Sequence, residues 1–247
     1  MAGHSKWAKV KRFKGAIDAK RGKIFSKLGR EITIAAKLGR GDPDMNPRLR
    51  MVLLKCRAAN MPADNIERAI KRGAGGGDAA NYEELTYEVY GPNGVALLVE
   101  VSTDNRNRTA AEIRSIVTKN GGSMATPGSV SRLFHRRGQM IIAREAANED
   151  QLMELALDAG AEDFKPELQG YEIVTDPAHF EAVHKQLEAR GIKCDAAGVT
   201  ELPTTTVPLA GAQTAAAVNR LIDALEEHDD VKDVHSNAEF PDETVKA

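Results

Sequence analysis

Basic side chains crowd the first 23 residues of the chain and offer the clearest chemistry in the sequence. That segment, MAGHSKWAKVKRFKGAIDAKRGK, contains eight Lys or Arg and a single acid, Asp18. Cations at this density neutralise the phosphates of a nucleic acid and release its condensed counterions. Trp7 and Phe13 lie among them, where an aromatic ring could stack on an exposed base. The alternative is a solvated segment that binds nothing specific. The residues predicted to bind nucleic acid are Lys6, Trp7, Lys9, Lys11, Arg12, Lys14, Lys20, Arg21, Lys23, Lys27 and Arg30.

The segment STDNRNRT, residues 102–109, is a second candidate site, in this case for an anion. It links an apolar strand to the start of a helix, where free backbone N–H groups and the helix dipole favour negative charge. Arginine side chains add guanidinium forks that suit phosphate or carboxylate. Ordinary turn chemistry with solvated arginines is an equally good interpretation. The candidate anion site comprises Asn105, Arg106, Asn107, Arg108 and Thr109.

Patterns typical of enzymes and metal sites fail on their spacing. The GAGGG of residues 73–77 follows no strand, so it is not a dinucleotide-binding fingerprint. His179 and His184 fall on different faces of a helix, which disfavours a zinc pair. The stretch EEHDD, residues 226–230, could hold a cation, but a solvated helix end is the better interpretation. No nucleophile–base pair stands out, so the sequence predicts no enzyme, no cofactor and no metal.

The two parts of the chain carry opposite net charge. Residues 1–72 contain 19 Lys or Arg against 6 Asp or Glu, whereas residues 73–247 contain 15 against 30. The overall net charge of −2 therefore conceals a basic front and an acidic remainder, which suggests a polyanion as partner of the front. The alternative is that the two parts neutralise each other by packing together.

The remaining compositional signals predict a cytoplasmic protein. No apolar run approaches the roughly 20 residues of a membrane helix, so no membrane partner is expected. The basic front is not followed by the apolar stretch of a secretory signal. Cys56 and Cys194 form no CxxC pattern and are interpreted as buried, reduced thiols.

Hydrophobic spacing predicts three helices and then alternating strands and helices. Residues 85–101 indicate two strands around Gly-Pro-Asn-Gly, and a capping box at Thr109–Glu112 predicts the start of the next helix. His135–Gly138 is interpreted as an exposed hairpin turn. The two helices before the glycine-rich linker are interpreted as an ordinary hairpin in preference to a helix-turn-helix. The predicted helices cover 25–38, 48–59, 63–72, 149–159, 177–190 and a segment from Val218 to Leu225, and the later strands cover 138–143, 171–175, 196–202 and 231–236.

These elements predict an α+β protein with a helical N-terminal domain and two α+β sandwich domains whose sheets are mostly antiparallel. The expected domains are a basic arm at 1–23, a three-helix domain at 24–78, an α+β domain built from 79–132 with 204–247, and an inserted α+β domain at 133–203.

Several separate segments resemble the YebC/PmpR family, in order and over essentially the whole length. The resemblance implies a helical N-terminal domain and two α+β domains about a cleft. It also implies a regulator of transcription that binds DNA, and related proteins, including a mitochondrial translational activator, are implicated in translation at the ribosome. It supplies no catalytic residues. The segments that carry it are AGHSKW, KRGKIFSKLGREI, NMPADNIERAIKRG, YGPNGVALLVEV, TDNRNRT and NGGSM.

The resulting hypothesis is a non-enzymatic regulator of gene expression that binds nucleic acid through residues 1–72. DNA and ribosomal or transfer RNA both stay open as partners, and so does the ribosome. The first alternative function is a ribosome-associated translation factor, and the second is an enzyme with its site at Arg106 and Arg108. The acidic remainder is left free for a protein partner that the sequence does not identify.

Overall fold

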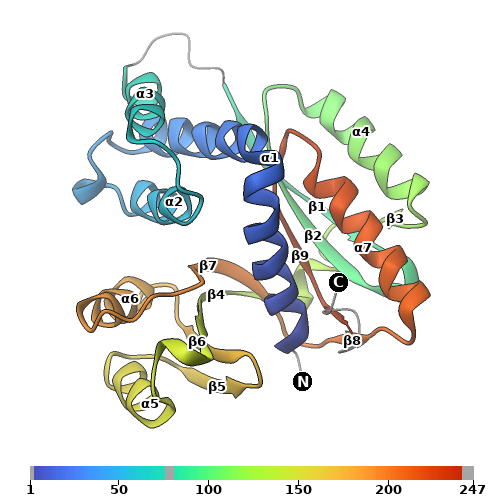
Figure 1. Ribbon diagram of the computed structural model, residues 1–247. Helices are drawn as coiled ribbons and strands as arrows, with labels where there is room; N and C mark the ends of the chain where they lie inside the picture. The colour runs from blue at the N-terminus through green and yellow to red at the C-terminus, as the bar shows by residue number, and fades with distance from the viewer. Residues whose placement is uncertain (1–2, 76–80, 241–247) are drawn as a thin grey trace.

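The computed structural model describes residues 3–75 and 81–240, with the side chains of residue 10 and of residues 21 onward within those ranges. The architecture is α+β, as predicted, with a helical unit beside two sheets that each carry helices on one face (Figure 1). Across the described ranges, every helix is too short or too polar to span a lipid bilayer.

Three helices form the amino-terminal unit. They are α1 (Gly3–Leu38), α2 (Pro47–Ala58) and α3 (Ala63–Ala74). Because α1 is helical from Gly3 onward, the break expected near residue 24 between an arm and a helix is wrong as a secondary-structure boundary. Figure 1 shows that the first part of α1 extends away from α2 and α3, towards β8.

Asn46 fixes the corner between α1 and α2. Its side-chain oxygen accepts a hydrogen bond from the Leu49 N–H at 3.1 Å and so caps α2. Its side-chain amide donates to the carbonyl oxygens of Ala35 at 2.9 Å and Arg40 at 2.8 Å. This buried amide therefore satisfies backbone groups at the end of one helix and the start of the next. The core below it contains Ile32, Leu49 and Cys56.

Two glycines on these helices predict opposite stability changes. A Cβ on Gly73 of α3 would collide with the Thr33 carbonyl oxygen and would lie 2.8 Å from the Ala36 Cβ, whereas a Cβ on Gly29 of α1 would meet nothing within 4 Å. We expect Gly73→Ala to lower the free energy of unfolding by about 1–3 kcal/mol, because α1 and α3 must move apart. Gly29→Ala is the matched control and should raise it by up to ~1 kcal/mol through helix propensity. Urea unfolding measures both, and an equal effect of the two variants would contradict the close approach.

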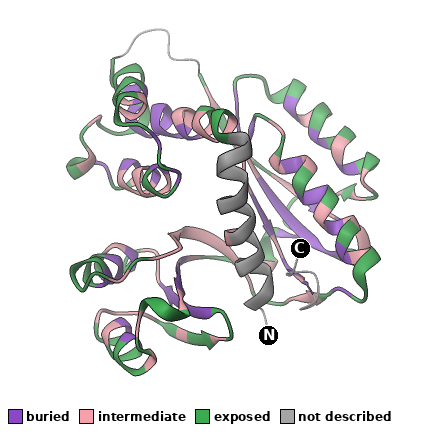
Figure 2. Ribbon diagram, viewed as in Figure 1, coloured by how far each residue is buried: buried purple, intermediate pink, exposed green. Residues whose placement is uncertain are grey.

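The first sheet has the strand order β3-β1-β2-β9, and all of its pairings are antiparallel. Alternation along β2 points Leu97, Val99 and Val101 into a core shared with α4 and α7. Figure 2 shows these strands as a buried band beneath the two helices. The bounds are β1 (Glu83–Tyr90), β2 (Ala96–Thr103), α4 (Arg106–Lys119), β3 (Ser123–Met124), α7 (Ala212–Glu226) and β9 (Val231–Ser236).

The second sheet has the strand order β5-β6-β4-β7 and is also antiparallel. Met140, Ile173 and Phe180 belong to its core, which Met51 and Leu54 of α2 extend from outside. The helical unit therefore packs directly on this sheet. The bounds are β4 (Phe134–Ala143), α5 (Glu149–Asp158), β5 (Asp163–Glu167), β6 (Gly170–Thr175), α6 (Phe180–Ala189) and β7 (Ala196–Pro203), and a short parallel pair joins β8 (Val207–Pro208) to β10 (Ala238–Glu239).

Some local predictions are wrong in ways that have a physical cause. The helix expected to start at the Thr109 capping box begins at Arg106, because Asn105 caps it and accepts a hydrogen bond from the Arg108 N–H. The predicted turn at residues 135–138 lies inside β4, where Arg136 pairs with Glu201 of β7. Pairing with β7, which is distant in sequence, keeps this polar stretch extended, and local sequence patterns do not reveal such pairing.

Candidate nucleic-acid interface

Three of the predicted phosphate-binding cations lie along one face of α1 and contact the segment that follows α7. Spacings of four and three residues place Lys23, Lys27 and Arg30 on that face. We call residues Glu226–Asp230 the acidic turn. Lys23 Nζ lies 3.1 Å from the Asp229 carboxylate, and Lys27 Nζ donates to the Glu226 carbonyl oxygen at 2.5 Å. These cations are therefore paired with oxygens of the protein itself.

Arg30 is the most fully engaged of the three. One guanidinium nitrogen donates to the Asp230 carboxylate at 2.9 Å and to the carbonyl oxygens of Ser102 at 2.9 Å and Asp229 at 3.2 Å. The guanidinium also lies over the Tyr82 ring, 5.1 Å from its centre. Arg30 thus joins α1 to the first sheet.

Burial is the largest influence on the pKa of Lys27. The pKa of Lys27 is lowered to about 8, chiefly because burial removes the ammonium group from water and also because of the positive charge of Lys23. The carboxylates of Glu226, Asp229 and Asp233 act in the opposite direction.

Asp230 is the buried anion at the centre of the contact, with a side chain only 6% exposed. Besides Arg30, its carboxylate accepts hydrogen bonds from Arg108 Nη2 at 2.8 Å and from the Thr109 hydroxyl at 2.7 Å. Burial alone would raise the pKa of Asp230, but the bonds from Thr109 and Arg108 and the charges of the two arginines outweigh it and hold the pKa at about 2. Asp230 is therefore ionised at neutral pH.

The predicted anion site at residues 105–109 receives this same carboxylate. Arg108 and Thr109 both bond to Asp230, and Arg108 also pairs with the exposed Asp104 at 2.9 Å. Asn105 is used as the helix cap, while Arg106 and Asn107 are exposed. The chemistry expected of this loop is present, but the anion that it holds in this structure is a side chain of the protein.

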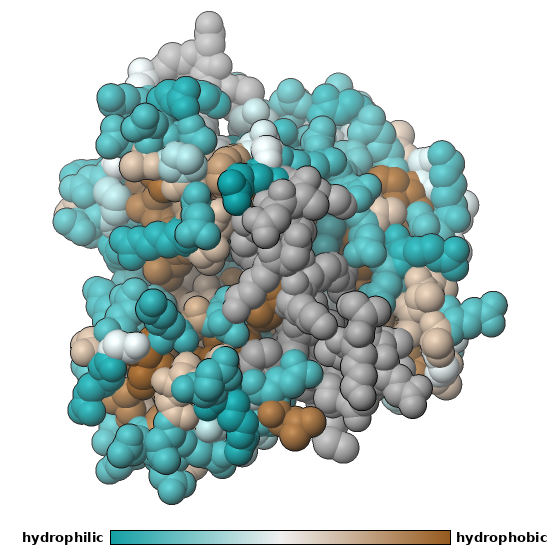
Figure 3. Space-filling model, in the orientation of Figure 1, coloured by the Kyte–Doolittle hydropathy of each residue, from teal (hydrophilic) through white to brown (hydrophobic). Residues whose placement is uncertain are grey.

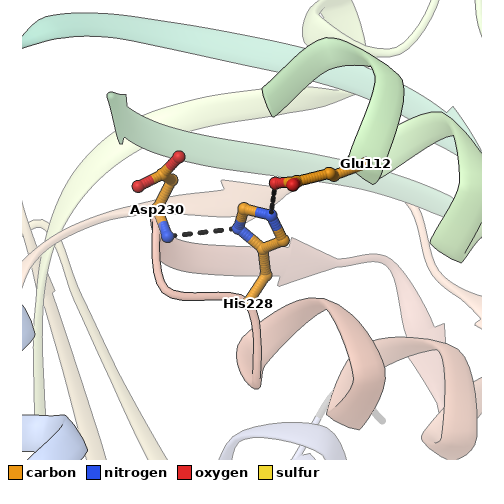
Figure 4. Close-up of side chains that lie close together, drawn as sticks. All are labelled: Glu112, His228 and Asp230. Carbon is orange, nitrogen blue, oxygen red and sulfur yellow. Dashed lines mark hydrogen bonds and ion pairs between the residues drawn. The ribbon is translucent and has the colours of Figure 1, made fainter. Parts of the chain in front are cut away.

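An open groove of about 680 Å³ lies between α1, α4 and the acidic turn. Figure 4 shows Glu112 and His228 side by side within it, with Asp230 beyond them. His228 Nδ1 accepts from the Asp230 N–H at 3.1 Å, so its Nε2 carries the proton and donates to Glu112 at 2.8 Å. The groove is lined by Lys23, Arg30, Asp104, Arg108, Glu112, Ser115, Ile116, Glu227, His228, Asp229 and Asp230.

Glu112, His228 and Asp230 are residue types that bind metal ions, and their ligand atoms lie within 4.8 Å of one another. Their hydrogen bonds oppose that use. A metal on His228 Nε2 would require the other tautomer and would break the bond from the Asp230 N–H. Asp230 also already faces two guanidinium groups, which repel a cation. The arrangement favours a structural role for this cluster.

Other cations of the helical unit tie it to both sheets. Arg48 pairs with Glu84 at 2.5 Å, and Arg50 binds Glu181 of α6 through two nitrogens at 2.8 and 3.0 Å. Lys55 lies between two acids, Glu31 at 3.2 Å and Asp233 at 3.1 Å. The charge of both carboxylates outweighs the effect of burial and raises the pKa of Lys55. Sequence reasoning missed this use of α2, since its partners are distant along the chain.

The rest of the predicted nucleic-acid-binding residues fall in the first part of α1. Arg21 is exposed. On α3, Lys71 and Arg72 are also exposed. The side chains of Lys6, Trp7, Lys9, Lys11, Arg12, Lys14 and Lys20 lie outside the described side chains, so their role stays a prediction.

Comparison with known proteins places the chain in a family over nearly its whole length. Residues 5–76 match the model of the TACO1/YebC protein N-terminal domain, and residues 82–238 match that of the TACO1/YebC second and third domain. Among relatives named "probable transcriptional regulatory protein", one from Desulforapulum autotrophicum is 51% identical and one from Opitutus terrae is 52% identical, each over 247 residues and 100% of both chains. A crystal structure of a conserved hypothetical protein from Aquifex aeolicus superposes with a TM-score of 0.83 at 44% identity, covering 94% of this chain and 95% of that one. The chain therefore belongs to the TACO1/YebC family.

Proposed function

We propose that this chain is a non-enzymatic regulator of gene expression that binds nucleic acid through its helical amino-terminal unit. The printed names of its relatives support the regulatory part. The observation that carries the nucleic-acid part is the excess of cations in residues 1–72, which contain 19 Lys or Arg against 6 Asp or Glu. Among the side chains that the structure describes, six of these cations contact the two sheets, their helices or the acidic turn, namely Lys23, Lys27, Arg30, Arg48, Arg50 and Lys55.

The chemistry of the arm favours contact with the backbone of a nucleic acid over reading of its bases. Only 4% of the residues are aromatic, so broad stacking platforms are not available. Phosphate contacts position a protein on a duplex but carry little sequence information. The face of the molecule in Figure 3 is largely hydrophilic among the described residues, consistent with a polar, water-filled contact. We therefore infer weak sequence specificity.

A translation factor remains the alternative, with ribosomal or transfer RNA as the polyanion, because structure-specific binding of RNA needs no base code. The second alternative, an enzyme at Arg106 and Arg108, loses support from the geometry. Arg108 is already hydrogen-bonded to the Asp230 carboxylate, so its guanidinium is not available to a substrate anion in this structure.

The test is direct binding of the full chain to duplex DNA and to structured RNA over a salt series, combined with sedimentation of cell extract on a sucrose gradient. Preference for a promoter fragment supports a DNA regulator. Co-migration with ribosomes and no promoter preference supports the translation factor. Absence of binding to both polymers at low ionic strength would contradict the proposal, since the electrostatic term is strongest there.

A further inference from the structure

The acidic turn places a row of oxygen acceptors along α1. Two of them belong to carboxylates, so the row is negatively charged, as the phosphates of a nucleic acid are. Lys23, Lys27 and Arg30 span about 10 Å of helix, given the rise of 1.5 Å per residue. Along that length they meet the carboxylates of Asp229 and Asp230 and the carbonyl oxygen of Glu226. These three cations, which sequence analysis assigns to phosphate, are thus already bound to oxygens of the protein.

The strength of these contacts changes along α1. The Lys23–Asp229 pair is open to water, with side chains 38% and 77% exposed, and such pairs contribute little. Arg30 and Asp230 are 24% and 6% exposed, and Arg30 also satisfies two backbone carbonyls. The outer end of the contact can therefore open while the inner end stays closed.

We propose that the acidic turn competes intramolecularly with nucleic acid for Lys23 and Lys27, while Arg30 stays on Asp230 as a fixed anchor. The inference rests on the proposed function, since it concerns the same helix. It adds a built-in restraint on binding, because each phosphate that reaches Lys23 must first displace Asp229. It also removes Arg30 from the set of residues that contact phosphate.

A double-mutant cycle on the full chain tests this competition, with a duplex DNA and a structured RNA of fixed length as probes. Asp229→Asn should tighten binding by about threefold, the range expected for breaking an exposed ion pair. In a Lys23→Gln background the same substitution should have a smaller effect, because Lys23 is missing and only the weaker attraction of Asp229 for Lys27 is removed. Lys23→Gln alone should weaken binding.

The matched control is Glu154→Gln on α5, an exposed position that changes the net charge equally and lies on the other sheet's helix. It should change the affinity by less than Asp229→Asn does. Equal effects of Asp229→Asn and Glu154→Gln, or an equal effect of Asp229→Asn in both backgrounds, would overturn the competition and leave the proposed function intact. Failure of the wild type and of every variant to bind either polymer would instead overturn the proposed function itself.

Discussion

Asp230→Ala is expected to lower the free energy of unfolding by about 3 kcal/mol, because it removes the buried acceptor shared by α1 and α4. Arg30, Arg108 and Thr109 all bond to this carboxylate. Thr109 is fully buried, so its hydroxyl loses a partner that water does not replace. Urea unfolding followed by circular dichroism measures the change.

The Asp230 carboxylate also makes the free energy of unfolding depend on pH. Its pKa is held at about 2, below the ordinary value of 3.8 for an aspartate. A depressed pKa in the folded state adds stability above the unfolded pKa, and here that amounts to about 2 kcal/mol. This share is lost as the pH falls from about 4 towards 2. The gap between wild type and Asp230→Ala should therefore narrow as the pH is lowered through that window.

Asp104→Ala is the control for Asp230, because it removes an exposed carboxylate that also pairs with Arg108. Asp104 is 51% exposed, and water can replace it on the guanidinium. The control should leave stability nearly unchanged. If Asp104→Ala destabilised the protein as much as Asp230→Ala, the importance assigned to the buried carboxylate would be wrong.

Replacing Lys9, Lys11, Arg12 and Lys14 together by glutamine is expected to weaken nucleic-acid binding by a hundredfold or more near 0.1 M salt. If about six cations of the chain contact duplex phosphates, log K should fall with log salt at a slope near −5. Removing four contacts should reduce that slope to about −2, since two contacts remain and each contributes about 0.9. Filter binding at several salt concentrations gives both quantities.

A control with the same change of charge separates local contact from overall charge. Arg114, Lys119, Lys185 and Arg190 are exposed and lie on or beside α4 and α6. Their replacement by glutamine should leave the slope close to its original value. An equal loss of slope in the two variants would show that the arm has no special role.

The structure indicates which residues a deletion of the arm should leave in place. Removal of residues 2–23 would delete Lys23, which pairs with Asp229, and would expose Ile24 and Phe25, which pack on the helical core. A deletion of residues 2–20 keeps these contacts and is expected to leave the remaining chain folded. The segment removed contains six cations, among them the four replaced in the glutamine variant, so the salt slope should fall at least as far as it does for the fourfold substitution.

Local spacing predicted most helices and strands because near neighbours in sequence determine it. The apolar positions Leu49, Val52 and Cys56 predicted a helix at 48–59, and α2 spans Pro47–Ala58. The missed strand β5 shows the limit. Its sequence DFKPE contains a proline and lies largely exposed at a sheet edge, so it lacks the alternation that marks a half-buried strand.

The sequence by itself determined the partition of charge and the helices at 25–38, 48–59 and 63–72, and it left an anion site and ordinary turn chemistry as equal interpretations of residues 105–109. Only the tertiary structure decided that this loop binds the Asp230 carboxylate and that Lys23, Lys27 and Arg30 contact the acidic turn. Asp230 lies 200 residues from Arg30 and 122 from Arg108. Periodicity and capping depend on residues three or four apart, whereas the partner of a charge depends on how distant elements pack, and that packing consumed cations that composition alone assigned to nucleic acid.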